Sequence, residues 1–324
     1  MAYPVPFATA DEVVRIAVEA EGLGYHEVSG NDHLSTQRFV REAWPQPPDY
    51  FEPLMMLATI AATTSVVRLG TGILVLPMRD PVLLAKQVAT LDQISGGRVT
   101  LAVGGIPRRI RKRGARSRRR VADRPDVRGH RVAACAVRAT PIHLRRQISA
   151  VRRCRVVSEK PVQTPLPIFS GGNGKGALQR AGERCEGWLP AKIGPADIAA
   201  GRAKVSTYAR AAGRDPADIT IGLQSVVCIA DTTQEARDRV ERSTFDLFRK
   251  SLKDTMMKGV DLDKYLADNL IGTPDEVCAK VAAFEEAGLD GFFATLFVAN
   301  TVDEMLEQMR LFARYVLPAF PDMS

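Results

Sequence analysis

The sequence predicts an α/β fold, a TIM (β/α)8 barrel that forms one domain over residues 1–324. Three observations support this prediction. Short apolar runs alternate with amphipathic helical patterns along most of the chain. The run 67–76 has no polar alternation, as expected for a strand covered on both faces in a parallel sheet. Residues 67–105 have the pattern of strand, helix and strand, which predicts a right-handed βαβ crossover.

The first elements follow from capping signals and periodicity. Thr9 and Glu12 form a capping box, and apolar positions three and four residues apart predict a helix that ends near Gly22 and Gly24. A short strand is then predicted over residues 25–29. The next helix is predicted over residues 53–64, directly before the apolar run described above.

The helix with the clearest boundaries begins after Asp80, an N-cap residue followed by Pro81 at the first helical position. Its apolar positions continue until Gly96 and Gly97, which end it. Residues 98–105 then form another buried strand. The glycines inside the strand that precedes this helix suit close approach of a ligand to the backbone.

From residue 159 onward the same alternation continues. The predicted strands cover residues 167–170, 187–190, 219–230 and 291–297. The predicted helices cover residues 176–184, 196–212, 234–251, 275–287 and 302–315. Together with the earlier elements these give seven strands, one fewer than a complete barrel needs. The first strand is expected to be short or missing, because only MAYPVPFA precedes the opening helix.

The basic character of the chain comes from one segment. The formal net charge is +8, but residues 106–157 hold 18 of the 45 basic residues and only two of the 37 acidic ones. The rest of the chain is therefore acidic. This arginine-rich segment, residues 106–157, contains no Glu, Phe, Tyr or Trp and a single Leu, so no helical or strand pattern can be traced in it.

Three explanations of the arginine-rich segment remain open. It could be a basic arm for nucleic acid or a solvated basic insertion. The third explanation, which we favour, is translation in a displaced reading frame. Synonymous codons for residues 106–112, read one nucleotide later, can encode SREEFA, and the same offset gives regular patterns from residues 125–138 and 145–157. We accordingly expect no specific nucleic-acid partner.

Composition excludes several other classes of protein. The five cysteines show no CxxC pair and no metal-ligand spacing, and none of the four histidines is paired at ligand spacing, so no metal site is expected. A reduced, cytoplasmic compartment is the simplest interpretation. No apolar run has transmembrane length, and no export signal is recognisable, so no membrane partner is expected.

Two groups of polar residues follow predicted strands. Asp32 and His33 come just after the strand 25–29, at the end where barrel enzymes build their sites. Histidine can protonate or polarise a substrate oxygen near neutral pH, and a neighbouring carboxylate could orient it; a capping pair in a loop is the alternative. The sequence GGNGK lies between a strand and a helix, so backbone N–H groups at that helix start could bind a phosphate, unless it is only a turn.

The sequence resembles the luciferase-like monooxygenase superfamily, most closely its branch of coenzyme F-420-dependent oxidoreductases. The resemblance is carried by DHL after the second barrel strand, by EPLMMLATIAATTSVVRLGTGILVLPMRDPVLLAKQVATLDQISGGRVTLAVGG, and by KPVQTPLPIFSGGNG and GWLP. It covers residues 9–105 and 159–315. It implies a luciferase-like TIM barrel and hydride transfer between the deazaflavin and a small organic substrate, with FMN-dependent monooxygenation as the alternative.

The resemblance also implies roles for particular residues. His33, with Asp32 beside it, would lie next to the deazaflavin ring and act in catalysis. Glycine-rich strand ends would line the ring, although crowding inside a barrel would also favour glycine there. The family often has a non-prolyl cis peptide in the stretch that corresponds to residues 70–73. The predicted cofactor-binding residues are Gly70, Thr71, Gly72, Ile73, Gly104, Gly105, Gly171, Gly172, Asn173, Gly174 and Lys175.

Three further expectations concern the core, the partners and the integrity of the chain. Trp188 is expected in the hydrophobic core. The binding partner is expected to be a small-molecule substrate, and assembly as a homodimer is left open.

If the arginine-rich segment is out of frame, the chain as written is expected to be an inactive, poorly folded product, because a barrel that loses a crossover helix uncovers apolar surface.

Overall fold

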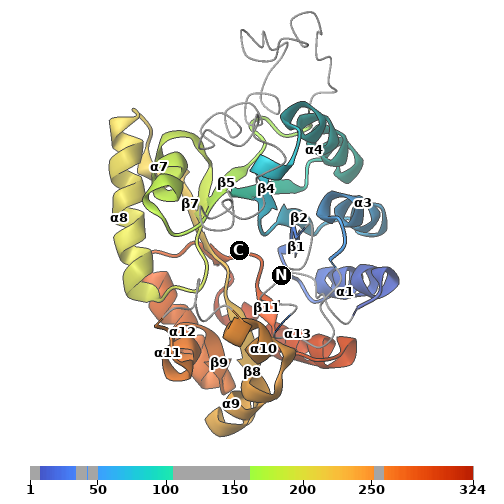
Figure 1. Cartoon of the computed structure of the whole chain (residues 1–324), viewed down its shortest axis with the longest axis vertical. Coiled ribbons are helices and arrows are strands. Elements are labelled where there is room, and N and C mark those ends of the chain that lie inside the picture. The colour runs from blue at the N-terminus through green and yellow to red at the C-terminus, as the bar shows by residue number, and fades with distance from the viewer. Residues whose placement is uncertain (1–7, 34–41, 43–49, 105–160, 252–258, 324) are drawn as a thin grey trace, which may run out of the picture.

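The computed structural model describes residues 8–33, 42, 50–104, 161–251 and 259–323. Gly105 and the arginine-rich segment, together with the expectations made for them, lie outside these ranges. The predicted α/β barrel class is confirmed. Figure 1 shows the strands inside a ring of helices, with α1, α3 and α4 on one side and α7 and α8 on the other.

The main sheet is parallel throughout and curls around the barrel axis. Its strand order is β1-β2-β4-β5-β6-β7-β10, with β3 paired to β4 beside this path. β1 and β10 form the two edges of this sheet, and no described strand bridges them to close it. The strands are β1 (Glu27–Gly30), β2 (Arg68–Thr71), β3 (Leu74–Val75), β4 (Val99–Gly104), β5 (Ile168–Gly171), β6 (Gly187–Leu189), β7 (Thr220–Leu223) and β10 (Gly291–Phe292).

Three strands that the sequence predicts as continuous are each broken into two. The predicted strand 67–76 divides into β2 and β3. The predicted strand 219–230 divides into β7 and β8 (Val226–Ile229), and 291–297 divides into β10 and β11 (Leu296–Phe297). Strands β8 and β11 join β9 (Leu270–Gly272), which was not predicted, in a three-stranded sheet of order β11-β8-β9. The break before β8 has a distant partner, since the Val226 amide donates to Oδ1 of Asn269, 43 residues away, at 2.9 Å. At the break between β10 and β11, Ala294 has a positive φ of 53°.

The helices begin where the capping signals predict. Thr9 and Glu12 form the capping box of α1, Asp80 caps α4, and Gly96 ends α4 in the left-handed conformation with φ 67°. The predicted helix 234–251 is in fact two helices, which separate at Ser243. The helices are α1 (Ala10–Gly22), α3 (Pro53–Thr63), α4 (Pro81–Ser95), α7 (Lys175–Arg184), α8 (Pro195–Ala211), α9 (Thr233–Arg242), α10 (Thr244–Ser251), α11 (Leu262–Ala267), α12 (Pro274–Glu286) and α13 (Val302–Tyr315).

Trp188 of β6 is a core residue, as predicted, with 2% of its surface exposed. Its ring packs against α8 at Gly201, where a Cβ atom would overlap the indole. The indole Nε1 donates to the carbonyl of Gly172 at 2.9 Å, in the loop that follows β5. Trp188 therefore connects the outer helix layer to a loop at the carboxyl end of the sheet.

We expect Gly201→Ala to lower the free energy of unfolding by about 1–3 kcal/mol, because the added methyl group must displace a fully packed indole. Thermal and urea unfolding of the variant would measure the loss. Gly213→Ala is a control for glycine loss at a position where an added Cβ atom would meet nothing within 4 Å, although its φ of 71° adds its own backbone cost. Unchanged stability of Gly201→Ala would contradict this packing.

Candidate active site

The carboxyl ends of parallel strands meet at one edge of the barrel, which we call the mouth, and most of the predicted residues lie there. His33 follows β1, the turn Gly72–Ile73 follows β2, and Gly104 ends β4. The GGNGK sequence, residues 171–175, joins β5 to α7. Barrel enzymes place their catalytic groups at this end.

His33 is partly buried at the mouth and contacts an aromatic ring. Its imidazole lies 4.3 Å from the ring of Tyr50, centroid to centroid, at an interplanar angle of 41°. Burial lowers the pKa of His33, and the positive charge of Lys192 lowers it further, whereas the charge of Asp32 acts in the opposite direction. Because the ordinary histidine pKa is about 6.5, the imidazole is neutral at pH 7 and can accept a proton.

Asp32 makes its hydrogen bonds to groups other than His33. Its Oδ2 accepts from the Val75 amide at 2.7 Å and from Arg79 Nε at 3.0 Å, and its Oδ1 accepts from Arg79 Nη2 at 2.8 Å. The carboxylate is almost fully buried, with 1% of its side-chain surface exposed. In these contacts Asp32 fixes the loop after β2 to the end of β1 and acts on His33 through its charge.

Arg79 is a residue of the mouth that no sequence motif identified. The guanidinium that holds Asp32 also pairs with Glu52, with Nη2 and Oε1 2.7 Å apart. Burial lowers the pKa of Arg79, but its hydrogen bonds to the Asp32 and Glu52 carboxylates and their negative charges outweigh burial, so the pKa is raised. The only sequence signal was the position of Arg79 directly before the helix cap Asp80.

The predicted ring-binding residues differ in accessibility. Gly72 and Ile73 are partly exposed at the mouth, and the peptide bond between them is cis. The Gly72 carbonyl accepts from Gln224 Nε2 at 3.4 Å. Gly104 and Gly171 are buried, and the side chain of Ile73 occupies the space that their Cβ atoms would fill. A ligand at the mouth would therefore meet Ile73 before it met either of these glycines.

The start of the predicted ring-binding stretch is part of the barrel interior. Gly70 lies against the buried side chains of Glu27 and Ser29, and a Cβ atom there would overlap the Glu27 carboxylate. Thr71 is also buried, and its hydroxyl donates to the Ala102 carbonyl at 2.7 Å. In this structure the close packing of side chains explains the glycine at position 70.

The GGNGK turn is exposed from Gly172 to Lys175. Gly172 has φ 109°, a conformation that glycine adopts readily. The Asn173 side chain forms two hydrogen bonds with the backbone of Ala191: Nδ2 donates to the carbonyl at 2.9 Å, and Oδ1 accepts from the amide at 3.1 Å. Gly174 is the N-cap of α7 and supplies no side-chain hydrogen bond. The Ala177 amide donates to the Gly174 carbonyl at 2.8 Å, which leaves the amides of Lys175 and Gly176 to bind an anion.

Lys192 is a second residue of the mouth that no sequence motif identified. It lies in the loop after β6, where it has a positive φ of 58°. Its amide donates to the Gln224 carbonyl at 3.3 Å, and Ala191 beside it is held by Asn173. Burial lowers the pKa of Lys192 to about 8. Only the loop conformation brings this lysine near His33.

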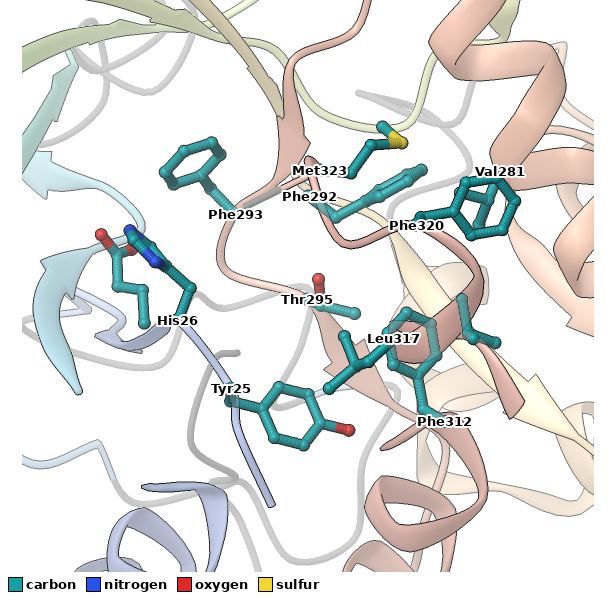
Figure 2. Close-up of a pocket in the computed structure, with 12 residues that line it drawn as sticks. Tyr25, His26, Val281, Phe292, Phe293, Thr295, Phe312, Leu317, Phe320 and Met323 are labelled. Atoms are coloured by element: carbon teal, nitrogen blue, oxygen red, sulfur yellow. The ribbon is translucent and has the colours of Figure 1, made fainter. Parts of the chain in front are cut away.

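A pocket lies at the opposite end of the strands, away from the mouth (Figure 2). It is located between the start of β1 and the start of β10, with α12 and the C-terminal residues on its outer side. Figure 2 shows that aromatic and aliphatic side chains make up most of its wall. Its lining includes Tyr25, His26, Glu27, Val281, Phe292, Phe293, Thr295, Phe312, Val316, Leu317, Phe320 and Met323.

Two kinds of feature are absent from the described residues. No group of three or more His, Cys, Asp or Glu side chains there could hold a metal ion. In the same part of the chain, no helix is long and apolar enough to cross a membrane.

Comparison with known sequences shows the family of the chain. The family model for luciferase-like monooxygenases matches residues 2–291. An uncharacterised protein of Mycobacterium tuberculosis is 26% identical over 222 residues, which is 62% of this chain and 72% of that protein. The 4-hydroxyprotoasukamycin monooxygenase of Streptomyces nodosus subsp. asukaensis is 34% identical over 119 residues, 35% of this chain and 30% of that protein.

Comparison with solved structures supports the same fold. Monooxygenase RslO1 from Streptomyces bottropensis has a TM-score of 0.76 at 23% identity, covering 96% of this chain and 93% of RslO1. The coenzyme F-420 dependent tetrahydromethanopterin reductase from Methanopyrus kandleri has a TM-score of 0.72 at 20% identity, covering 99% and 97%. With the barrel, its mouth and the match to the family model over most of its length, the chain belongs to the luciferase-like monooxygenase family.

Proposed function

We propose that this protein is an oxidoreductase that transfers hydride between coenzyme F-420 and a small organic substrate at the mouth of the barrel. The observation that carries the proposal is the placement of His33, the Gly72–Ile73 turn and the exposed GGNGK turn at the carboxyl ends of β1, β2 and β5. A proton-transfer group, an apolar ring contact and an anion-binding turn are the three parts that such a reaction requires.

The residues at the mouth fit a deazaflavin or flavin cofactor. The phosphate would lie at the start of α7, where Gly174 leaves open space and Lys175 adds a positive charge. The ring would lie against Gly72 and Ile73, the two accessible residues of the turn after β2. The buried residues Gly70, Thr71, Gly104 and Gly171 would support this surface from below.

The chemistry of the chain itself centres on His33. A bound F-420 supplies or takes up the hydride. His33 is neutral at pH 7, so it can accept a proton from a substrate oxygen, or return it in the opposite direction. Burial raises the pKa of Tyr50 to about 12, so its hydroxyl stays protonated while its ring contacts the imidazole. Lys192 adds a positive charge to the same region, which favours an oxygen with developing negative charge.

FMN-dependent monooxygenation is the second candidate function. Two observations favour it: the relative from Streptomyces nodosus is named a monooxygenase, and the oxygenating constituent of 3,6-diketocamphane monooxygenase from Pseudomonas putida, solved with FMN, has a TM-score of 0.65 at 21% identity. A structure described as an F-420-dependent secondary alcohol dehydrogenase, with a TM-score of 0.74 at 17% identity, favours F-420 in the same way.

Equilibrium binding of each cofactor separates the two candidates. The purified chain is titrated with F-420 and with FMN, and binding is followed by the change in cofactor fluorescence. The proposal predicts one F-420 per chain and at least tenfold weaker binding of FMN. Tighter binding of FMN, with oxygen consumed when the cofactor is reduced, would instead assign the chain to the monooxygenases.

We expect Lys175→Glu to weaken cofactor binding about tenfold, because it places a negative charge beside the phosphate at the start of α7. The dissociation constant from the same titration measures this. Lys204→Glu is the matched control, since Lys204 is an exposed lysine on the neighbouring helix α8. Equal affinities of the two variants would contradict a phosphate site at the GGNGK turn.

A further inference from the structure

We propose that Arg79 is a positioning residue that holds the His33–Tyr50 pair and the Gly72–Ile73 turn in one fixed arrangement. This inference rests on the proposed function, because it concerns how the proton-transfer group is placed relative to the cofactor-facing turn. The Arg79 side chain is largely buried, with 12% of its surface exposed, and we assign it no contact with substrate.

The first link runs from Arg79 to His33. Arg79 Nε and Nη2 bind the two oxygens of Asp32 at 3.0 and 2.8 Å, a two-pronged contact that fixes orientation as well as distance. Asp32 directly precedes His33 in the chain, so fixing the Asp32 side chain also restricts the position of the His33 backbone from which the imidazole extends. A guanidinium held by a nearly inaccessible carboxylate is a rigid support for that position.

The second link runs from Arg79 to Tyr50. Arg79 Nη2 lies 2.7 Å from Glu52 Oε1, while Glu52 Oε2 accepts from the Met55 amide at 2.8 Å and so caps α3. Tyr50 is two residues before Glu52. One guanidinium is thus tied to the segments that carry both partners of the ring contact between His33 and Tyr50.

The third link runs to the turn that faces the cofactor. Val75 lies two residues after Ile73, and its amide donates to Asp32 Oδ2 at 2.7 Å. Arg79 follows β3 by a few residues and binds the same carboxylate, so the chain between β2 and α4 is held to Asp32 at two points. The end of β1, the start of α3 and the loop after β2 therefore meet at the Asp32–Arg79–Glu52 group.

The charge of Arg79 also matters for His33. The charged and titratable groups that act on the imidazole are Asp32, which favours its protonation, and Lys192, which disfavours it; the Tyr50 ring covers it. Arg79 offsets the negative charge of Asp32. Without Arg79, the uncompensated carboxylate would raise the pKa of His33.

The test compares Arg79→Met and Arg79→Lys in the full chain without cofactor, by proton NMR. The chain has four histidines, and His33→Gln identifies the His33 signal. In Arg79→Met we expect the pKa of His33 to rise by about half a unit or more. In both variants we expect the nuclear Overhauser effect between the His33 and Tyr50 rings to fall by about half or more. Methionine binds neither carboxylate, and lysine keeps the charge but cannot span Asp32 and Glu52 together. In Arg79→Lys the pKa should stay near that of the unchanged protein.

Arg202→Met is the matched control, since Arg202 pairs with Asp290 just before β10, at the opposite end of the barrel. Arg202→Met should leave unchanged both the pKa of His33 and the nuclear Overhauser effect between the His33 and Tyr50 rings. If Arg79→Met does not fold, the ring contact in Arg79→Lys decides. An unchanged ring contact in a folded variant would overturn the proposal. Because these measurements need no cofactor, failure of the chain to bind F-420 would count against the proposed function and not against this inference.

Discussion

Replacing His33 with glutamine is expected to slow hydride transfer by about 10²–10⁴-fold while the cofactor still binds, the usual loss when a general acid or base is removed. Glutamine keeps the polar character of the side chain but cannot take up a proton. The neighbouring Tyr50 ring and the proposed phosphate-binding turn are unchanged, so affinity for F-420 should change less than about threefold. Single-turnover absorbance measurements of the cofactor would give the rate, with binding measured separately.

His26→Gln is the matched control for His33→Gln. His26 is more exposed than His33, but loss of hydration is the main cause that lowers the pKa of both imidazoles. It lines the pocket at the other end of the strands, shown in Figure 2. We expect no more than a twofold change in rate for this variant. A rate for His33→Gln equal to that of the control would remove His33 from the chemistry.

Restoring the reading frame across residues 106–157 is expected to raise the thermal transition of the chain by about 10 °C and to increase its soluble yield. The sequence of the segment has no Glu, Phe, Tyr or Trp and shows no helical periodicity, so it predicts no amphipathic crossover helix. Uncovering about 200 Å² of apolar surface would cost about 5 kcal/mol. That is a large part of the 5–15 kcal/mol that typically stabilises a domain.

The nucleotide sequence across codons 104–160 is the first measurement. Displacement predicts that reading one nucleotide later gives a continuous pattern of apolar and charged residues. The repaired gene should then give a protein that binds cofactor stoichiometrically. A chain as written whose thermal transition and soluble yield equal those of the repaired protein would refute the prediction. Steeply salt-dependent DNA or RNA binding that is lost on deleting the segment would favour the basic-arm explanation instead.

The sequence predicted those parts of the fold that depend on neighbouring residues. The capping box at Thr9, the N-cap at Asp80 and the left-handed Gly96 are all present, because each depends on hydrogen bonds within a few positions. Breaks in predicted elements had distant causes. The Thr244 amide, at the break between α9 and α10, donates to Asn300 Oδ1, 56 residues away. No local pattern records such a bond.

The same distinction applies to the mouth. Strand ends predicted that His33 and the GGNGK turn would lie at one edge, because parallel strands place their carboxyl ends together. The contact between Asp32 and Arg79 joins residues 47 positions apart and arises only when β1 and the loop after β2 lie side by side. Lys192 acquires its position from a backbone with positive φ, which its residue type does not predict.

A crystal structure of the chain with F-420 would test the central claim most directly. We predict that the ring contacts Ile73 within reach of His33, and that the phosphate accepts hydrogen bonds from the backbone between Gly172 and Lys175. A cofactor bound elsewhere, such as the pocket lined by His26 and Phe292, or with its phosphate away from α7, would contradict the assignment of the mouth as the active site.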